Sequence, residues 1–261
     1  MKIAITVDLE KDIGFMDSFY GIDEGLPFLL DIFRNKNIKA TFFINCEAIE
    51  HLSKNGFLSQ LIEDSHEIAS HGYHHNDYRM MNYDKLRNEI CLSKKTIEEY
   101  TGRTIKGYRA PQFLINPDVV NAIKECGFIY DSSLPDMSGI SAAKMRKVKV
   151  DEKLLSAFNE TGVKEFQIDS IPFIKVPHGI LWINFISFLL YKLFMLNNKK
   201  NFMMFYLHPF DIIEKKGRIK MNFKRKIFYL KNKNGIKELL EELLDYWISE
   251  GTNFVKLEDE L

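Results

Sequence analysis

Short apolar runs alternate with longer amphipathic stretches through the first half of the chain, and this order restricts the fold more than any other feature. Runs typical of strands lie at 2–8, 39–44, 66–71, 105–109 and 128–133. Stretches typical of helices lie at 25–38, 47–64, 83–102 and 117–126. Because neighbouring parallel strands need a helical crossover between them, the alternation predicts a parallel sheet with helices outside it.

The second half carries fewer signals of this kind. Residues 136–165 give weak patterns, whereas 202–208 (FMMFYLH) reads as a buried strand and 235–251 as a helix. With 261 residues and no internal repeat, the pattern favours one α/β domain covering 1–261, built as a (β/α) barrel and not as an open sheet. Residues at the carboxyl ends of its strands would then gather at one face.

Positive and negative charges balance over the whole chain. Lys and Arg together number 36, as do Asp and Glu, and the isoelectric point is about 7.1. A dedicated nucleic-acid-binding protein would carry a clear excess of positive charge. We therefore expect no nucleic acid among the partners of this protein.

The cysteines and the first residues bear on the compartment. Cys46, Cys91 and Cys126 are odd in number, far apart and in no paired spacing, which predicts buried free thiols and a reducing compartment. The opening MKIAITVDLE reaches an acidic residue by position 8, has no long apolar segment and no cleavage site, and does not read as a signal peptide. We therefore expect a cytoplasmic protein.

Three of the seven histidines lie within the stretch EIASHGYHHNDY, residues 67–78. His71 and His75 are four residues apart, and on one helical turn that spacing places both side chains on the same face. Two imidazoles in this arrangement can bind one metal ion. His74 lies between them on another face, where we expect it to support a ligand or to face solvent.

Further polar residues follow the other predicted strands, and a parallel barrel would bring them to the same face. They are Asp8, Glu10, Arg109, Asp131 and His208. Two histidines and one carboxylate make a three-ligand metal site with open positions for water and substrate. A second carboxylate can accept the proton of an attacking water, and a histidine opposite it can protonate a leaving group. This set is suited to hydrolysis of an amide or an ester.

Each of these residues also has an ordinary structural interpretation. Asp8 could cap the helix that follows its strand, and Arg109 could be a surface residue. His208 ends a strongly apolar strand and could be a buried histidine held by hydrogen bonds.

Five motifs, in this order and spacing, resemble the polysaccharide deacetylase family, also described as the NodB-homology domain or carbohydrate esterase family four. They are TVDLE (6–10), SHGYHH (70–75), YRAPQF (108–113), YDSSLP (130–135) and YLHPFD (206–211). The resemblance covers roughly 1–135 and 200–261 and is closest to relatives that act on bacterial surface glycans and lipid-linked sugars. It implies a distorted (β/α)7 barrel that binds a divalent metal ion, with zinc preferred.

The resemblance also implies a role for individual residues. Asp8 would be the general base, Arg109 would orient it, and His208 would be the general acid. The backbone N–H of Gln112 would help to hold the oxyanion. Leu207 would line the pocket for the acyl methyl group.

His71 and His75 would be metal ligands, but the third ligand departs from the family pattern of two adjacent aspartates. Here the second acidic residue is Glu10, two positions after Asp8. Alternate residues of a strand point to the same face, so Glu10 is expected to reach the metal, with Asp12 as the alternative.

The resemblance predicts a metal-dependent hydrolase that removes an N-acyl group, acetyl or formyl, from a sugar in surface polysaccharide or lipid-linked glycan metabolism. The fourth family motif usually contains a tryptophan, which YDSSLP lacks, and Asp131 in this motif is the expected partner of a catalytic histidine. Two alternatives remain open: an allantoinase-like hydrolase of cyclic amides on the same fold, and a catalytically inactive glycan-binding protein.

Two segments of the second half are unusual in composition. Residues 180–196 (ILWINFISFLLYKLFML) are nearly all apolar but shorter than the ~20 residues of a bilayer span, so they predict either a buried barrel helix or a helix in a membrane interface. Residues 214–234 carry nine basic residues against Glu214, which suits a solvated loop, anionic lipid headgroups or a phosphate-bearing substrate. Together they predict peripheral contact with the inner face of the membrane and an N-acylated sugar linked to lipid phosphate.

Overall fold

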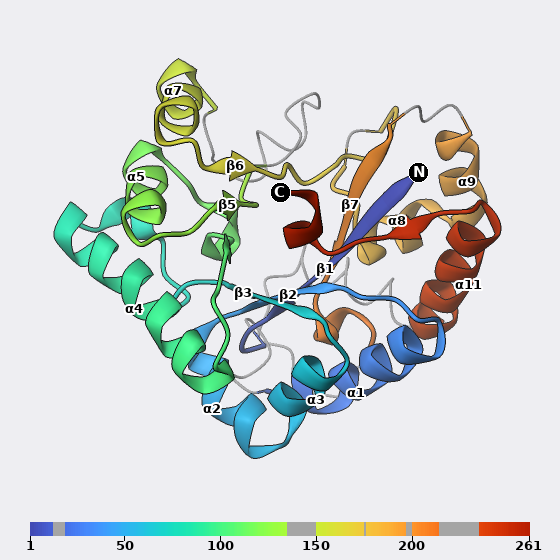
Figure 1. The fold of residues 1–261 in the computed structure, drawn as a ribbon. Helices are drawn as coiled ribbons and strands as arrows, with labels where there is room; N and C mark the ends of the chain where they lie inside the picture. The colour runs from blue at the N-terminus through green and yellow to red at the C-terminus, as the bar shows by residue number, and fades with distance from the viewer. Residues whose placement is uncertain (13–18, 135–149, 175, 197–199, 214–234) are drawn as a thin grey trace, which may run out of the picture.

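The computed structural model describes residues 1–12, 19–134, 150–174, 176–196, 200–213 and 235–261. One sheet of eight parallel strands runs through these residues, with the order β6-β5-β4-β3-β2-β1-β7 and with β8 paired to β1. The strands are β1 (Lys2–Leu9), β2 (Thr41–Ile44), β3 (Glu67–Ser70), β4 (Gly107–Tyr108), β5 (Tyr130–Asp131), β6 (Lys164–Glu165), β7 (Phe202–Leu207) and β8 (Asn253–Phe254). The sheet curls into a distorted barrel that stays open between β6 and β7 (Figure 1). The expected α/β barrel fold is confirmed.

Helices surround the curled sheet on its outside (Figure 1). The α-helices are α1 (Tyr20–Asn35), α2 (Cys46–Lys54), α3 (Phe57–Glu63), α4 (Tyr83–Thr101), α5 (Pro117–Glu125), α7 (Glu152–Thr161), α8 (Ile180–Ile186), α9 (Phe188–Met195) and α11 (Ile236–Ser249). The 3₁₀ helices are η1 (Tyr78–Met80), η2 (Pro111–Phe113), η3 (Pro209–Asp211) and η4 (Leu257–Glu260). Helix α5 begins as predicted, with the Asn116 side chain accepting the N–H of Val119 at 3.0 Å.

Alternation along the strands separates two apolar clusters. On β1, Ile3, Ile5 and Val7 pack in the outer cluster beneath the helices, whereas Ala4 belongs to a smaller cluster inside the barrel. The outer cluster buries most of the apolar side chains and supplies the main hydrophobic stabilisation. The even-numbered positions of β1 therefore face the barrel interior, and its last polar residues follow the same alternation.

The end of the chain closes the barrel at the amino ends of the strands. The dark red η4 lies at the centre of the ring of strands in Figure 1. The N–H of Leu257 donates to the Thr41 hydroxyl and the N–H of Glu258 to the Glu67 carboxylate, each at 3.0 Å. Both acceptors are the first residues of their strands, so this plug lies opposite to the face where the strands end.

Three predicted helices differ in their bounds. The helix expected at 25–38 begins earlier, at Tyr20. The helix expected at 47–64 is two helices, because Gly56 adopts a left-handed φ of 76° between them. The segment 180–196 is likewise interrupted at Ser187, which separates α8 from α9.

The interrupted segment is neither fully buried nor able to span a bilayer. Tyr191 is buried, but Leu189 and Leu196 are 71% and 72% exposed. Among the residues that the structure describes, no helix has both the length and the apolar character of a membrane span. The basic segment 214–234, which was predicted to act with this one, lies outside the described residues.

The prediction of three free thiols is wrong for two of the cysteines. Cys91 of α4 and Cys126, which follows α5, form a disulfide with their Cα atoms 4.9 Å apart. Cys46 is free and buried, and burial raises the pKa of its thiol to about 12. Disulfides persist mainly in oxidising environments, so the cysteine pattern no longer argues for a reducing compartment.

We predict that the unreduced protein, unfolded in denaturant, exposes one reactive thiol, because only Cys46 is unpaired. Replacing Cys91 and Cys126 together by Ser should lower the free energy of unfolding by about 4 kcal/mol, since the bond closes a long loop of the unfolded chain. Thiol titration and denaturant unfolding measure the two quantities, with Cys46→Ala as the control that keeps the bond. Three reactive thiols before reduction would contradict the pairing.

Candidate active site

An arginine inside the barrel holds the first predicted site residue. Asp8 is 1% exposed, and one of its carboxylate oxygens accepts a hydrogen bond from Nη1 of Arg109 at 2.6 Å. Arg109 is itself fully buried and also donates to the Thr6 hydroxyl and to the carbonyl of Ser132. Its guanidinium lies 4.0 Å from the ring centroid of Phe43. The arrangement fixes one oxygen of Asp8 and leaves the other turned toward the site.

Glu10 follows on the same face, and two imidazoles converge on it. One Glu10 oxygen lies 2.7 Å from Nε2 of His75 and 3.2 Å from Nε2 of His71. Burial raises the pKa of the Glu10 carboxyl, but the close contacts with both histidines and the charges of His75 and His208 hold it well below its usual range. Glu10 is therefore a carboxylate with a strong affinity for cationic neighbours.

These three side chains fit a transition-metal ion. One donor atom from each of Glu10, His71 and His75 lies within 4.8 Å of the others. Nδ1 of His71 lies 2.9 Å from the carbonyl oxygen of Arg109, which can only accept, so His71 presents the lone pair of Nε2 to the site. Two imidazoles and one carboxylate are a donor set that zinc and similar ions prefer.

The alternative ligand Asp12 does not belong to this group. Its carboxylate accepts the backbone N–H of Gly21 at 2.7 Å, at the start of α1. Asp12 therefore contacts the start of α1, and the structure brings Glu10, not Asp12, to the two histidines.

The two histidines converge, but not on a helical turn as predicted. The chain bends after β3, and Gly72 adopts a left-handed φ of 79° between the two histidines. The bend is held by the Tyr78 hydroxyl, which accepts the N–H of Tyr73 at 2.9 Å and donates to the carbonyl of His74 at 3.0 Å. The side chain of His74 is 47% exposed and contacts Glu89, so it faces solvent.

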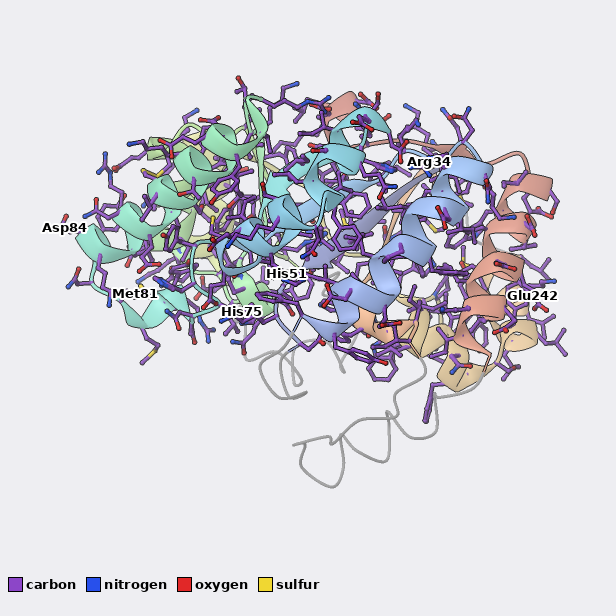
Figure 2. All side chains as sticks on the ribbon, turned by 90° about the horizontal axis from the view of Figure 1, so that it is seen from below. Arg34, His51, His75, Met81, Asp84 and Glu242 are labelled. Carbon is purple, nitrogen blue, oxygen red and sulfur yellow. A yellow bond between two sulfur atoms is a disulfide. The ribbon has the colours of Figure 1, made fainter. Side chains whose placement is uncertain are left out.

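Figure 2 relates this bend to the rest of the molecule. His75 and His51 lie toward the edge at which α1 begins, whereas Arg34, close to the end of α1, lies toward the opposite edge (Figure 2). The candidate site is therefore at the face where the parallel strands end, as expected for a barrel of this kind.

His208 completes the group from the end of β7. Its Nε2 lies 3.8 Å from the free oxygen of Asp8 and 3.6 Å from Glu10. Burial would lower the pKa of the imidazole, but the hydrogen bond with Asp211 and the charges of Asp211, Glu10 and Asp8 raise it to about 9. His208 is thus protonated at neutral pH and faces the two carboxylates.

The turn that carries His208 packs closely on α1. A Cβ atom added at Gly25 would collide with the carbonyl oxygen of Pro209, and one at Gly21 would lie 2.7 Å from Cβ of Phe210. The two glycines are one helical turn apart and form a flat surface against which η3 rests. No larger residue at either position would leave η3 where it is.

Gln112 lies in η2, directly after Pro111. Gln112 and Phe113 both have positive φ, 56° and 59°, in the left-handed region that residues with a side chain rarely adopt. Phe113 is buried with its ring 5.4 Å from the Arg109 guanidinium. Backbone strain of this kind persists where surrounding packing holds it and is frequent at functional sites.

Two expected roles do not match the geometry. Asp131 accepts the N–H and the hydroxyl of Ser133 at 2.9 and 2.7 Å, and burial raises the pKa of this carboxyl and of its neighbour Glu165. Asp131 is therefore not the partner of His208. Leu207 is buried in the outer cluster on the far side of β7, so it does not line an acyl pocket.

Sequence reasoning missed the residue that does contact His208. Asp211 lies three positions later in the same motif, and its carboxylate is 3.3 Å from Nδ1 of His208. The spacing of a helix-capping pair, in which a polar residue is followed three positions later by an acidic one, would have been the signal.

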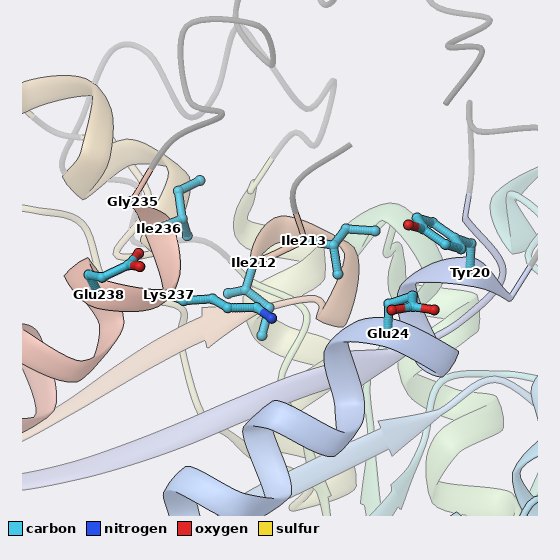
Figure 3. Close-up of a pocket in the computed structure, with 8 residues that line it drawn as sticks. All are labelled: Tyr20, Glu24, Ile212, Ile213, Gly235, Ile236, Lys237 and Glu238. Carbon is cyan, nitrogen blue, oxygen red and sulfur yellow. The ribbon is translucent and has the colours of Figure 1, made fainter. Parts of the chain in front are cut away.

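A separate hollow of about 220 Å³ lies beyond η3, between the starts of α1 and α11 (Figure 3). It is lined by Tyr20, Glu24, Ile212, Ile213, Gly235, Ile236, Lys237 and Glu238. None of these is a predicted site residue. The hollow adjoins the turn that carries His208 but is not the group of ligands described above.

Comparison with known proteins agrees with this geometry. The polysaccharide deacetylase family model matches residues 2–130. A peptidoglycan deacetylase of Helicobacter pylori is 27% identical over 145 residues, which is 51% of this chain and 49% of that one. The chain therefore spans about half the length of this curated relative.

Solved structures show the same fold over nearly the whole chain. The Bc1960 peptidoglycan N-acetylglucosamine deacetylase superposes with a TM-score of 0.56 at 18% identity and covers 99% of this chain and 86% of that one. A pseudoenzyme of carbohydrate esterase family four from Bacillus anthracis gives 0.55 at 11% identity, with 99% and 64% covered. Residues 2–130 of this chain therefore belong to the polysaccharide deacetylase family.

Proposed function

We propose that the protein is a metal-dependent hydrolase that removes an N-acyl group, acetyl or formyl, from a sugar. The observation that supports the proposal is the cluster of polar side chains at the carboxyl ends of the barrel strands. Three donors suited to one ion lie together, with the Asp8 carboxylate and the His208 imidazole both directed at them. The name of the Helicobacter pylori relative supports an N-acetylated sugar of a surface glycan as the substrate class.

Glu10, His71 and His75 would hold the ion. A divalent ion there supplies Lewis-acid polarisation of the acyl carbonyl and lowers the pKa of a water molecule. Zinc is our preferred ion because imidazole and carboxylate are its usual ligands together with thiolate.

The remaining residues move protons and hold charge. Asp8, fixed by Arg109, accepts a proton from the attacking water. The backbone N–H of Gln112 would donate to the oxyanion of the tetrahedral intermediate. His208 then gives a proton to the departing nitrogen as the C–N bond breaks, leaving acetate or formate and an amino sugar.

We further propose that the substrate is associated with a membrane. Helix α9 exposes Leu189 and Leu193, at 71% and 51%, and Leu196 directly after it is 72% exposed. Its single charged side chain, Lys192, lies along the surface with Nζ 4.3 Å from the ring centroid of Phe188. A face of this kind suits an interfacial position with an N-acylated sugar on lipid phosphate nearby. A position at the inner face of the membrane is our prediction from the sequence. The disulfide between Cys91 and Cys126 argues against it, because disulfides persist mainly in oxidising environments.

Metal content is the first prediction of the proposed function. Protein dialysed against zinc should retain about one ion per chain, and His71→Ala or Glu10→Ala should lose it, because a three-ligand site does not survive loss of one ligand. Elemental analysis after dialysis measures this. Asp12→Asn is the matched control and should keep the ion, since Asp12 accepts a backbone N–H of α1 and does not contact the two histidines. Unchanged zinc in His71→Ala would remove the proposed site.

Deacylation is the second prediction. Zinc-loaded protein should release acetate or formate from N-acyl sugars presented as glycan, nucleotide or lipid-phosphate conjugates, detected by mass spectrometry. Asp8→Asn should lower kcat by about 10²–10⁴-fold with little change in KM, because it removes the base and keeps the shape.

Two other results would favour the alternatives. Turnover of cyclic amides but of no N-acyl sugar would identify the allantoinase-like reaction. Sugar binding without turnover by zinc-loaded protein would identify a catalytically inactive glycan-binding protein.

Membrane contact is the third prediction. Replacing Leu189 and Leu193 together by Ser should reduce sedimentation with anionic lipid vesicles at least ~10-fold, because two leucines leave the bilayer surface. Leu155→Ser is the control, since Leu155 is a 46% exposed leucine on α7. Equal binding of all three proteins, or no binding by the wild type, would contradict membrane contact through α9.

A further inference from the structure

The carboxylate of Asp211, beside the proposed active site, makes contacts that have no role in the reaction proposed above. Oδ2 of Asp211 accepts the backbone N–H of His208 at 2.8 Å and lies 3.3 Å from Nδ1 of the same residue. An ionised carboxylate has no proton to donate, so Nδ1 of His208 carries the hydrogen of this contact. Nε2 is then the ring nitrogen that faces Asp8 and Glu10.

Stacking alone does not set this orientation. The ring of Phe210 lies against that of His208, with centroids 4.5 Å apart and planes 14° apart. A half turn of the imidazole about χ2 would keep the stack and bring a carbon to the place of Nε2. The contact between Nδ1 and Asp211 distinguishes the two orientations, because the partner of one ring nitrogen fixes the role of the other.

The burial of Asp211 also indicates a role beyond capping the turn of η3. The residue is 5% exposed, and its Oδ1 is buried without a hydrogen-bond partner among the residues that the structure describes. A buried, half-satisfied carboxylate destabilises the fold, and a neutral side chain could cap the same turn at lower cost. Asp131, the partner expected from the sequence, is engaged by Ser133 and is not among the ion pairs of His208.

We propose that Asp211 is the positioning residue of His208, which it holds with Nε2–H directed at the leaving nitrogen of the substrate. Asp211 acts through His208 and does not touch the reacting atoms. The inference rests on the proposed hydrolase function and deepens it by naming what orients the proton donor.

The test compares an amide with an aryl ester. The nitrogen of an N-acetyl sugar needs a proton to leave, whereas the 4-nitrophenolate of 4-nitrophenyl acetate leaves without one. Asp211→Ala should therefore lower the ratio of amide to ester rates at least ~30-fold, chiefly in kcat, because it disables the acid step alone. His208→Ala should show the same pattern. Both rates come from the same folded fraction, so their ratio does not depend on how much of a variant folds.

Asp169→Ala is the matched control. Asp169 is a second buried aspartate whose carboxylate accepts a backbone N–H of β7, that of Met204 at 2.6 Å, but it lies outside the proposed active site. Its loss should change the ratio by less than about 3-fold. Asp211→Asn, which keeps one acceptor oxygen at the same reach, should recover most of the ratio lost in Asp211→Ala.

The outcomes separate the inference from the function on which it rests. Equal losses on amide and ester in Asp211→Ala, or an unchanged ratio, would overturn the positioning role while leaving the hydrolase in place. A zinc-loaded wild type that hydrolyses neither substrate would overturn the proposed function and this inference with it.

Discussion

The ion pair between Asp8 and Arg109 is the constraint on which the rest of the site depends. Both side chains are almost completely removed from water, where an unpaired charge would cost several kcal/mol. The burial of one is tolerated only because the other is present. The guanidinium is satisfied on all sides: its N–H groups meet the Thr6 hydroxyl and the Ser132 carbonyl as well as Asp8, and its face lies on Phe43.

Through these contacts one side chain relates four strands. Thr6 and Asp8 belong to β1 and Phe43 to β2, Arg109 follows β4, and Ser132 follows β5. The carbonyl of the same arginine also receives the Nδ1 proton of His71, which follows β3. A displacement of Arg109 would therefore change the proposed base and one metal ligand together. The proposed base and this one proposed ligand are thus related through a single residue and not through independent loops.

The sequence predicted those parts of the site that depend on local geometry. Strand alternation is enough to place Asp8 and Glu10 on one face, and the structure has them there. The convergence of His71 and His75 followed from an assumed helical turn, whereas the real cause is a bend at Gly72 braced by a tyrosine hydroxyl. Their spacing is compatible with both geometries, so the pattern alone could not distinguish them.

Contacts between distant segments were not accessible in this way. Cys91 and Cys126 are 35 positions apart and meet because α4 packs against α5, which no spacing rule indicates. The contact of Asp211 with His208, in contrast, is a local one within a capping pair, whereas Asp131 is engaged by Ser133. The interruption of the apolar stretch at Ser187 comes with a positive φ of 76°, which the apolar pattern does not indicate.

The position of β1 has a consequence for the order in which the molecule can assemble. This first strand is internal to the sheet, with β2 on one side and β7 and β8, from the end of the chain, on the other. During synthesis the strand that bears the proposed base emerges before β7, so one of its edges stays open until some two hundred further residues have left the ribosome. The nascent chain must keep that edge from pairing with other polypeptides, and the proposed ligands cannot meet the proposed acid before β7 has been synthesised.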